Sequence, residues 1–295
     1  MGEITATMVK ALRDKTDAPM MECKKALTEA NGEISKAEEI LRVKLGSKAG
    51  KTSSRITAEG VISISVFQKK ASMVEINCET DFVAKNEEFI NFSKNISRIV
   101  VESESDSIQE INQKEINGTQ VETLRKGLIG KIGENISIRR ATFVKSEGTF
   151  YSYTHGSKIG VLVDLSIENE ELGKDIAMHI AAMKPKAIKT SDVDPKLIDI
   201  ERRVATEKAS ESGKPPEIME KMVDGAINKF LKEVSLYGQV FVKSDDNKMT
   251  IQNLLEKNNA SVNYFAIFVV GEGLEKKNEN FADEVAATTA ASKAN

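Results

Sequence analysis

Tryptophan is absent from this sequence of 295 residues, and aromatic residues make up only 5% of it. A hydrophobic core must therefore be built from aliphatic side chains, Met and Ala. No run approaches the roughly 18 consecutive apolar residues of a membrane-spanning helix. The first residues have neither the basic nor the apolar region of a secretory signal, and Ala6 stands where myristoylation needs Ser or Thr. The sequence predicts a soluble, cytoplasmic protein.

Cysteine is scarce, and charge of either sign has no large excess. Cys23 and Cys78 are far apart and lack the C-x-x-C spacing, which argues against a disulfide framework or a zinc site and suits a reducing cytosol. The formal net charge is -3, with both signs spread along the chain. We therefore expect no global basic surface for DNA and no disordered acidic tail.

Residues that carry chemistry are also few. Of the two histidines, His179 lies on the apolar side of a predicted helix, which favours a hydrogen-bonded core histidine, and His155 lies in a turn with no evident catalytic partner. Residues 46–52 resemble a phosphate-binding loop, but Leu45 stands where the motif needs Gly and a helix precedes it instead of a strand. No zinc, dinucleotide or nucleophile-elbow motif is present. The sequence indicates no enzyme active site, no metal and no cofactor, although composition alone leaves the enzyme class open.

The first 55 residues predict a small helical module. Apolar spacing indicates two helices before the helix-stopping pair Asn31 and Gly32, and a third helix over residues 33–44. Residues 46–55, rich in Lys, Ser and Gly, predict a flexible basic linker. Its cations are either a solvated hinge or contacts to phosphate.

Residues 56–274 predict an α+β core with an internal repeat. Alternating apolar residues indicate strands over 59–67 and 73–78, followed by an amphipathic helix after Asn86. The same hairpin-plus-helix order recurs in 149–153, 159–167 and 170–183. A polar helix (120–132) and a strand (135–144) lie between the copies. We expect two related subdomains, 56–145 and 146–274, each with a helix packed on an antiparallel sheet.

An antiparallel helical hairpin interrupts the second subdomain over about 187–232. Two helical periods over 195–230 flank the turn around Gly213 and Pro215. This hairpin is either a partner site or dimer seam, or a solvated protrusion. The chain returns through a helix (251–257) and a strand (262–270), and a short helix near 281–287 lies in a C-terminal module over 275–295.

A corner between strand and helix is the candidate functional site. Thr80 ends the strand alternation and Asn86 can cap the next helix, which leaves Asp81 and Phe82 outside both elements. Two alternatives are open for the Phe82 ring. Phe82, Phe89 and Ile96 are seven residues apart, a spacing that favours a core position, whereas the two boundary residues favour an outward one.

Several motifs together resemble one family, bacterial elongation factor Ts, the guanine-nucleotide exchange factor for elongation factor Tu. They are the run EINCETDFVAK at 75–85, a second signature at 12–13 and 16–27, residues 131–140, and residues 155–162. Residues 17–19 read Asp17-Ala18-Pro19 where Gly-Ala-Gly is usual in the family, so the chain departs from the family at Asp17 and Pro19. The resemblance covers essentially the whole chain.

The resemblance implies a fold and a mode of action. It implies an N-terminal three-helix module like the ubiquitin-associated (UBA) domain, two core subdomains, an inserted hairpin and a C-terminal helix. It also implies that Asp81 and Phe82, in a corner completed by Thr80 and Val83, enter the partner elongation factor Tu and displace the elements that hold Mg²⁺ against GDP.

The resemblance further assigns supporting contacts with the partner, which are His155, Ile132, Lys24, Met20 and Met21. The family catalyses nucleotide release and forms no bond, so we expect no enzyme. The alternative function is a passive adaptor or chaperone that binds a partner without nucleotide exchange. A homodimer or a 2:2 complex through the core or the hairpin stays open.

Overall fold

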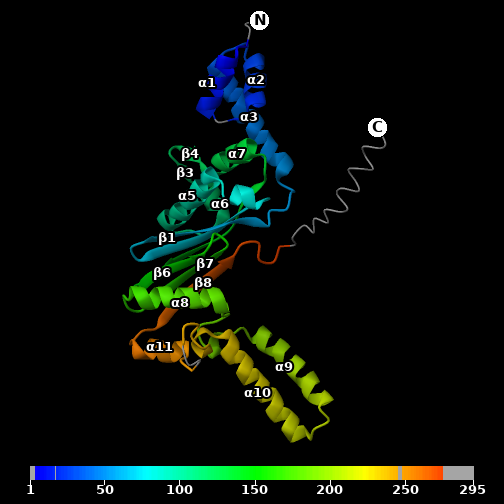
Figure 1. Cartoon of the computed structure of the whole chain (residues 1–295), viewed down its shortest axis with the longest axis vertical. Coiled ribbons are helices and arrows are strands. Elements are labelled where there is room, and N and C mark those ends of the chain that lie inside the picture. Colours follow the sequence, from blue (N-terminus) through cyan, green and yellow to red (C-terminus); the bar gives the residue numbers. More distant parts are fainter. Residues whose placement is uncertain (1–3, 17, 245–247, 275–295) are drawn as a thin grey trace, which may run out of the picture.

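Two three-stranded sheets are stacked between helices in a computed structural model that describes residues 4–16, 18–244 and 248–274 (Figure 1). The α+β class predicted from the sequence is confirmed. The helices are α1 (Ala6–Thr16), α2 (Met20–Glu29), α3 (Ile34–Thr52), α4 (Asp81–Ala84), α5 (Glu87–Ser103), α6 (Ile108–Gln113), α7 (Val121–Ile132), α8 (Glu170–Met183), α9 (Pro195–Glu211), α10 (Pro216–Val234) and α11 (Ile251–Lys257). The strands are β1 (Glu59–Phe67), β2 (Lys70–Cys78), β3 (Glu115–Ile116), β4 (Thr119–Gln120), β5 (Ile136–Lys145), β6 (Thr149–His155), β7 (Ile159–Leu165) and β8 (Val262–Val269). None of the described helices is long and apolar enough to cross a membrane.

Helices α1, α2 and α3 form a small bundle at one end of the molecule (Figure 1). Its core consists of aliphatic and small side chains, among them Leu12, Cys23, Leu27 and Leu41. The three helices agree with the prediction, and the likeness to a UBA domain stays a prediction.

The predicted flexible linker is wrong over residues 46–52, because α3 continues to Thr52. Helix α3 packs against α7, where Leu45 meets Gly130 so closely that a Cβ on this glycine would lie 2.5 Å from the Leu45 Cβ. Tertiary packing of this kind overrides the weak helix propensity of a Lys-, Ser- and Gly-rich segment. The bundle is thus joined to the core by a helix.

The first sheet has the strand order β1-β2-β5, all antiparallel. Helix α5 covers one face, and the core between them includes Ile76, Phe89, Ile96 and Ile129. Helix α6 and the β3–β4 hairpin lie between α5 and α7, and neither was predicted from the sequence.

The second sheet has the order β6-β7-β8 and repeats this plan, with α8 on its outer face (Figure 1). Each unit consists of a hairpin, a covering helix and a later third strand that pairs with the second. The predicted internal repeat is therefore present. His179 on α8 is a hydrogen-bonded core histidine, as expected: it is fully buried, and its Nε2 lies 3.0 Å from Gln239 Oε1.

The two sheets pack against each other through their inner faces. A cluster of Ala71, Phe150 and Leu162 lies between them, and the Ile62 N–H donates to the Ser157 carbonyl at 2.9 Å. This contact across the sheets holds β1 beside the turn between β6 and β7.

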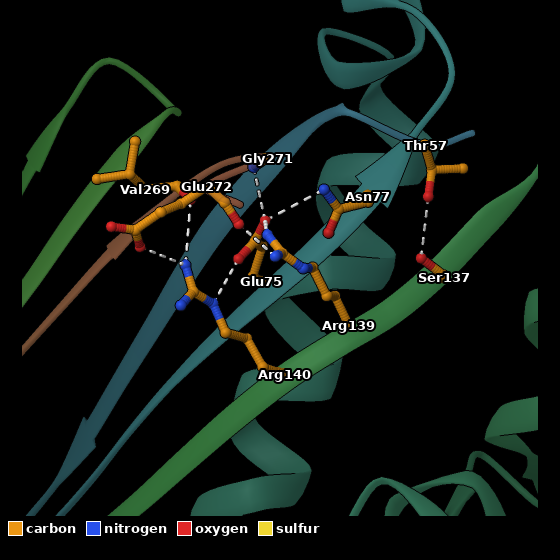
Figure 2. Close-up of polar contacts among 9 residues, drawn as sticks. All are labelled: Thr57, Glu75, Asn77, Ser137, Arg139, Arg140, Val269, Gly271 and Glu272. Carbon is orange, nitrogen blue, oxygen red and sulfur yellow. Dashed lines mark hydrogen bonds and ion pairs between the residues drawn. The ribbon is translucent and has the colours of Figure 1, made fainter. Parts of the chain in front are cut away.

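A buried carboxylate connects the two subdomains at one end of this interface (Figure 2). Glu75 on β2 is fully buried and accepts hydrogen bonds from Gly271 N (2.8 Å), Arg139 Nη1 (2.9 Å), Arg140 Nε (2.6 Å) and Asn77 Nδ2 (3.1 Å). Burial alone raises the pKa of Glu75, but the Gly271 N–H and the two arginines outweigh it, and the net pKa lies below its ordinary value.

Helices α9 and α10 pack against each other and project from the second subdomain (Figure 1). Their seam is a small cluster of Ala205, Ala209, Val223 and Ile227. The predicted helix near residues 281–287 and the module around it lie outside the described residues.

Candidate partner-binding site

The corner after β2 is built by two successive helix caps. Thr80 is the N-cap of the one-turn helix α4, and its Oγ1 accepts the Val83 N–H at 3.5 Å. Asn86 then caps α5 by accepting the Glu88 and Phe89 amides at 2.9 and 3.2 Å. Because each cap ends one direction of the backbone and begins another, the chain turns sharply twice within seven residues of Thr80.

The ring of Phe82 points away from the protein. Phe82 is 80% exposed, the highest value among the large apolar residues that the structure describes, whereas Phe89 and Ile96 are fully buried. The core alternative for Phe82 is therefore wrong. The spacing of seven is broken because Lys85 and Asn86 separate α4 from α5, so the two helices do not share one apolar stripe.

Of the other residues of the corner, one is anchored in the core and two are partly accessible at the surface. Val83 is 8% exposed and belongs to the core between α5 and the first sheet. It therefore anchors the corner and has little surface available to a partner. Thr80 and Asp81 are half-buried, and Asp81 Oδ2 pairs with Lys85 Nζ at 2.7 Å. The hydrogen bond from Lys85 lowers the pKa of Asp81, which keeps a negative charge beside the exposed ring.

A groove of about 890 Å³ lies beside Phe82. Its lining carries both signs of charge and includes Ile56, Glu59 and Lys158, the last two paired at 2.6 Å. Ile56 is 50% exposed, so the groove adds apolar surface next to the ring. The described part of the chain contains no group of three His, Cys, Asp or Glu residues that could hold a metal. The corner and groove offer an apolar ring, a carboxylate and mixed charges, which suits contact with another macromolecule.

Two of the predicted supporting residues lie in segments next to the corner. Ile132 is half-buried at the end of α7, immediately before a loop that bonds to Thr80. His155 is exposed at the end of β6, with its Nδ1 3.3 Å from Tyr153 Oη, and the turn that follows it reaches the groove through Lys158.

The other three lie on α2 in the terminal bundle. Lys24 is exposed, and Met20 and Met21 are 53% and 62% exposed. Figure 1 shows α2 in the terminal bundle, apart from the two three-stranded sheets, so these residues form an exposed surface separate from the corner after β2.

Sequence reasoning missed the contribution of Glu134. Its carboxylate accepts two backbone amides and a hydroxyl from Glu79 and Thr80. The only signal in the sequence is an acid directly after the helix-ending Gly133, and this does not indicate which amides it binds.

Comparison with known proteins agrees with the resemblance seen in the sequence. The family model described as "Elongation factor TS" matches residues 79–272, which include the corner, β5, the second sheet and helices α9 and α10. Elongation factor Ts of Aromatoleum aromaticum is 57% identical over 294 residues, with 99% of each chain covered. The proteins of the same name from Burkholderia lata and Burkholderia cenocepacia are each 55% identical over 293 residues, again with 99% of each chain covered.

The chain belongs to the elongation factor Ts family. It is thereby a protein of translation elongation. Its family match begins at Glu79, so the exposed ring of Phe82 and its capped corner lie at the very start of the matched region.

Proposed function

We propose that this elongation factor Ts binds elongation factor Tu in its GDP-bound form and promotes GDP release, after which GTP can be loaded. Phe82 and Asp81 enter the partner and disturb its Mg²⁺ site. One observation carries the proposal: an aromatic side chain that is 80% exposed stands on a corner fixed by two helix caps.

The physical chemistry of GDP release favours the insertion of an exposed aromatic side chain and a carboxylate next to the Mg²⁺ site. In GTP-binding proteins Mg²⁺ bridges the nucleotide phosphates and the protein, so losing its coordination removes much of the nucleotide affinity. Burying a Phe ring in a partner pocket gains about 1.5–3 kcal/mol. The carboxylate of Asp81 adds repulsion against the acidic groups that hold the metal.

One ring does not suffice. Shifting a two-state equilibrium from 1:99 to 99:1 takes a preference of about 10⁴-fold, or roughly 5.5 kcal/mol of differential binding. Because the coupling is reciprocal, this protein weakens GDP binding by the factor by which GDP weakens its own binding. We infer that additional contacts supply the remainder, through Ile132 and His155 near the corner and through Met20, Met21 and Lys24 on α2.

Stopped-flow release of a fluorescent GDP from purified elongation factor Tu tests the proposal. We expect this protein to accelerate release in a saturable way. The alternative, a passive adaptor or chaperone, predicts that the two proteins form a complex while the release rate stays unchanged. That outcome would remove exchange from the function and leave only binding.

A further inference from the structure

The loop between α7 and β5 places a carboxylate beneath the corner. Gly133 ends α7 with a φ of 88°, a left-handed conformation that glycine adopts without strain, and this turns Glu134 toward the end of β2. Glu134 Oε2 accepts the N–H groups of Glu79 and Thr80 at 3.1 and 3.0 Å. Its Oε1 accepts the Thr80 hydroxyl at 2.6 Å.

The carboxylate of Glu79 makes hydrogen bonds in the opposite direction, from the end of β2 to the loop after α7. Glu79 Oε1 accepts the Asn135 N–H at 2.6 Å and the guanidinium of Arg55 at 3.3 Å. Arg55 Nη1 also donates to the Gly133 carbonyl at 3.3 Å. Residues 79–80 and 133–135 thus exchange hydrogen bonds in both directions, which restrains the corner against rotation about the end of β2.

We call the hydrogen bonds between residues 79–80 and 133–135 the clamp. The clamp is linked to α4 through the Thr80 hydroxyl, which has a single proton. The hydroxyl donates this proton to Glu134 Oε1. The lone pairs of Oγ1 are then left to accept the Val83 N–H, the bond that caps α4. Glu134 therefore orients the cap of the helix that carries Phe82.

We propose that Glu134 is a positioning residue for nucleotide exchange: through Thr80 it holds α4 in the orientation from which Phe82 enters the partner. The inference rests on the proposed function and adds a residue that acts through another one. A Phe82 ring that is already held in the orientation for entry loses less conformational freedom when it enters the partner. Removing the Glu134 carboxylate should therefore lower the maximal release rate more than it weakens the initial binding of the two proteins.

The test compares Glu134→Ala and Glu134→Gln with the native protein, and with Glu102→Ala as a control that removes an exposed carboxylate from α5 in the same subdomain. Stopped-flow GDP release is measured over a range of concentrations. For Glu134→Ala we expect the maximal rate to fall roughly tenfold, while the half-saturating concentration changes by less than about threefold. Glu134→Gln keeps an acceptor oxygen for the two amides and should restore most of the rate.

Amide hydrogen exchange supplies a readout without any partner. The Glu79 and Thr80 amides should lose protection in Glu134→Ala and regain it in Glu134→Gln, with Glu102→Ala like the native protein. Unchanged protection in Glu134→Ala overturns the clamp. Lost protection with an unchanged maximal rate overturns the positioning role.

Two further outcomes are distinguishable. If Glu134→Ala does not fold, Thr80→Val and Thr80→Ser replace it: the first removes the orienting hydroxyl and should lower the maximal rate, and the second keeps the hydroxyl and should restore most of the rate that Thr80→Val loses. If the native protein does not accelerate GDP release, the proposed function fails, and the exchange measurement still decides whether the clamp exists.

Discussion

Phe82 and Val83 are consecutive residues, but Phe82 is 80% exposed at the surface, whereas Val83 is buried with an exposure of 8%. Successive residues of a helix point about 100° apart, so a single helical turn can send one apolar side chain outward and the next into the core. Helix α4 does this because the Thr80 cap fixes where the turn begins.

Because one of these residues is buried and the other is exposed, substituting each in turn should separate effects on the stability of the protein from effects on its action on the partner. Val83→Ala removes two buried methyl groups and should lower the free energy of unfolding by about 2 kcal/mol. Phe82→Ala should leave the melting temperature nearly unchanged and slow stimulated GDP release. Thermal unfolding and stopped-flow release of each variant check this. A loss of several degrees in Phe82→Ala would contradict the exposed position of the ring.

The buried carboxylate of Glu75 should be a main determinant of contact between the subdomains. Glu75→Gln leaves Arg139 and Arg140 facing a neutral acceptor, and we expect a loss of about 2–3 kcal/mol, since both arginines are partly exposed. Glu272→Gln is the control, because Glu272 lies on the exposed rim of the same network and should cost less than about 1 kcal/mol. Urea unfolding at pH 7 measures both.

The same carboxylate predicts a pH dependence. The pKa of Glu75 is lower in the folded protein than in the unfolded chain, so its stabilisation is present above the unfolded pKa and is lost as pH falls through the folded pKa. The difference in stability between the native protein and Glu75→Gln should therefore shrink as the pH falls below about 4.3. A difference that stays constant into strong acid would contradict the shift.

The buried side chain of His179 predicts a second pH dependence of stability, in a less acidic range. Burial lowers its pKa, and its two ring nitrogens contact Gln239 Oε1 and the Val242 N–H. The unfolded chain takes up a proton near pH 6.5 and the folded protein does not, so stability should decrease as pH falls below about 6.5, by up to ~1.4 kcal/mol per pH unit. His179→Gln, which cannot take up that proton, should show a flatter profile between pH 7 and 5.5. An NMR titration midpoint of His179 at or above 6.5 would contradict this.

Two glycines of α7 predict opposite effects of the same substitution. A Cβ on Gly130 would lie 2.5 Å from the Leu45 Cβ, so Gly130→Ala should push α3 away and destabilise the protein by about 1–3 kcal/mol. Gly127 has open space at its Cβ position, and Gly127→Ala should stabilise the helix by up to about 1 kcal/mol. Thermal unfolding compares the two, and limited proteolysis within α3 should accelerate only in Gly130→Ala.

The two cysteines should be inert in the folded protein. Burial raises the pKa of the Cys78 thiol to about 12, and its Sγ donates to the Thr80 carbonyl at 3.1 Å; burial also raises the pKa of Cys23. Thiolate is the reactive form, so a thiol reagent at pH 8 should label neither cysteine before denaturation and both after it. Phe82→Cys provides the positive control, since its thiol should react at once.

Local patterns predicted most of the elements correctly. The alternation before Thr80 and the capping residue Asn86 predicted β2, the corner and α5, and the same reasoning placed α8 at Glu170–Met183. The corner's character was only half predictable. The spacing of Phe82, Phe89 and Ile96 favoured a core position for Phe82, and only the boundary residues Thr80 and Asn86 favoured the outward position. The spacing also gave no indication that Val83 is buried.

By itself the sequence determined most of the strands and helices and the cap that Asn86 places on α5, because propensity, alternation and capping act over a few neighbouring residues. Only the tertiary structure decided that residues 46–52 are helical, that Glu75 connects the two subdomains and that Glu134 holds Thr80. Each of these depends on a partner more than fifty residues away in the chain. Packing and hydrogen bonds between such distant segments arise only when the chain has folded and brings them together.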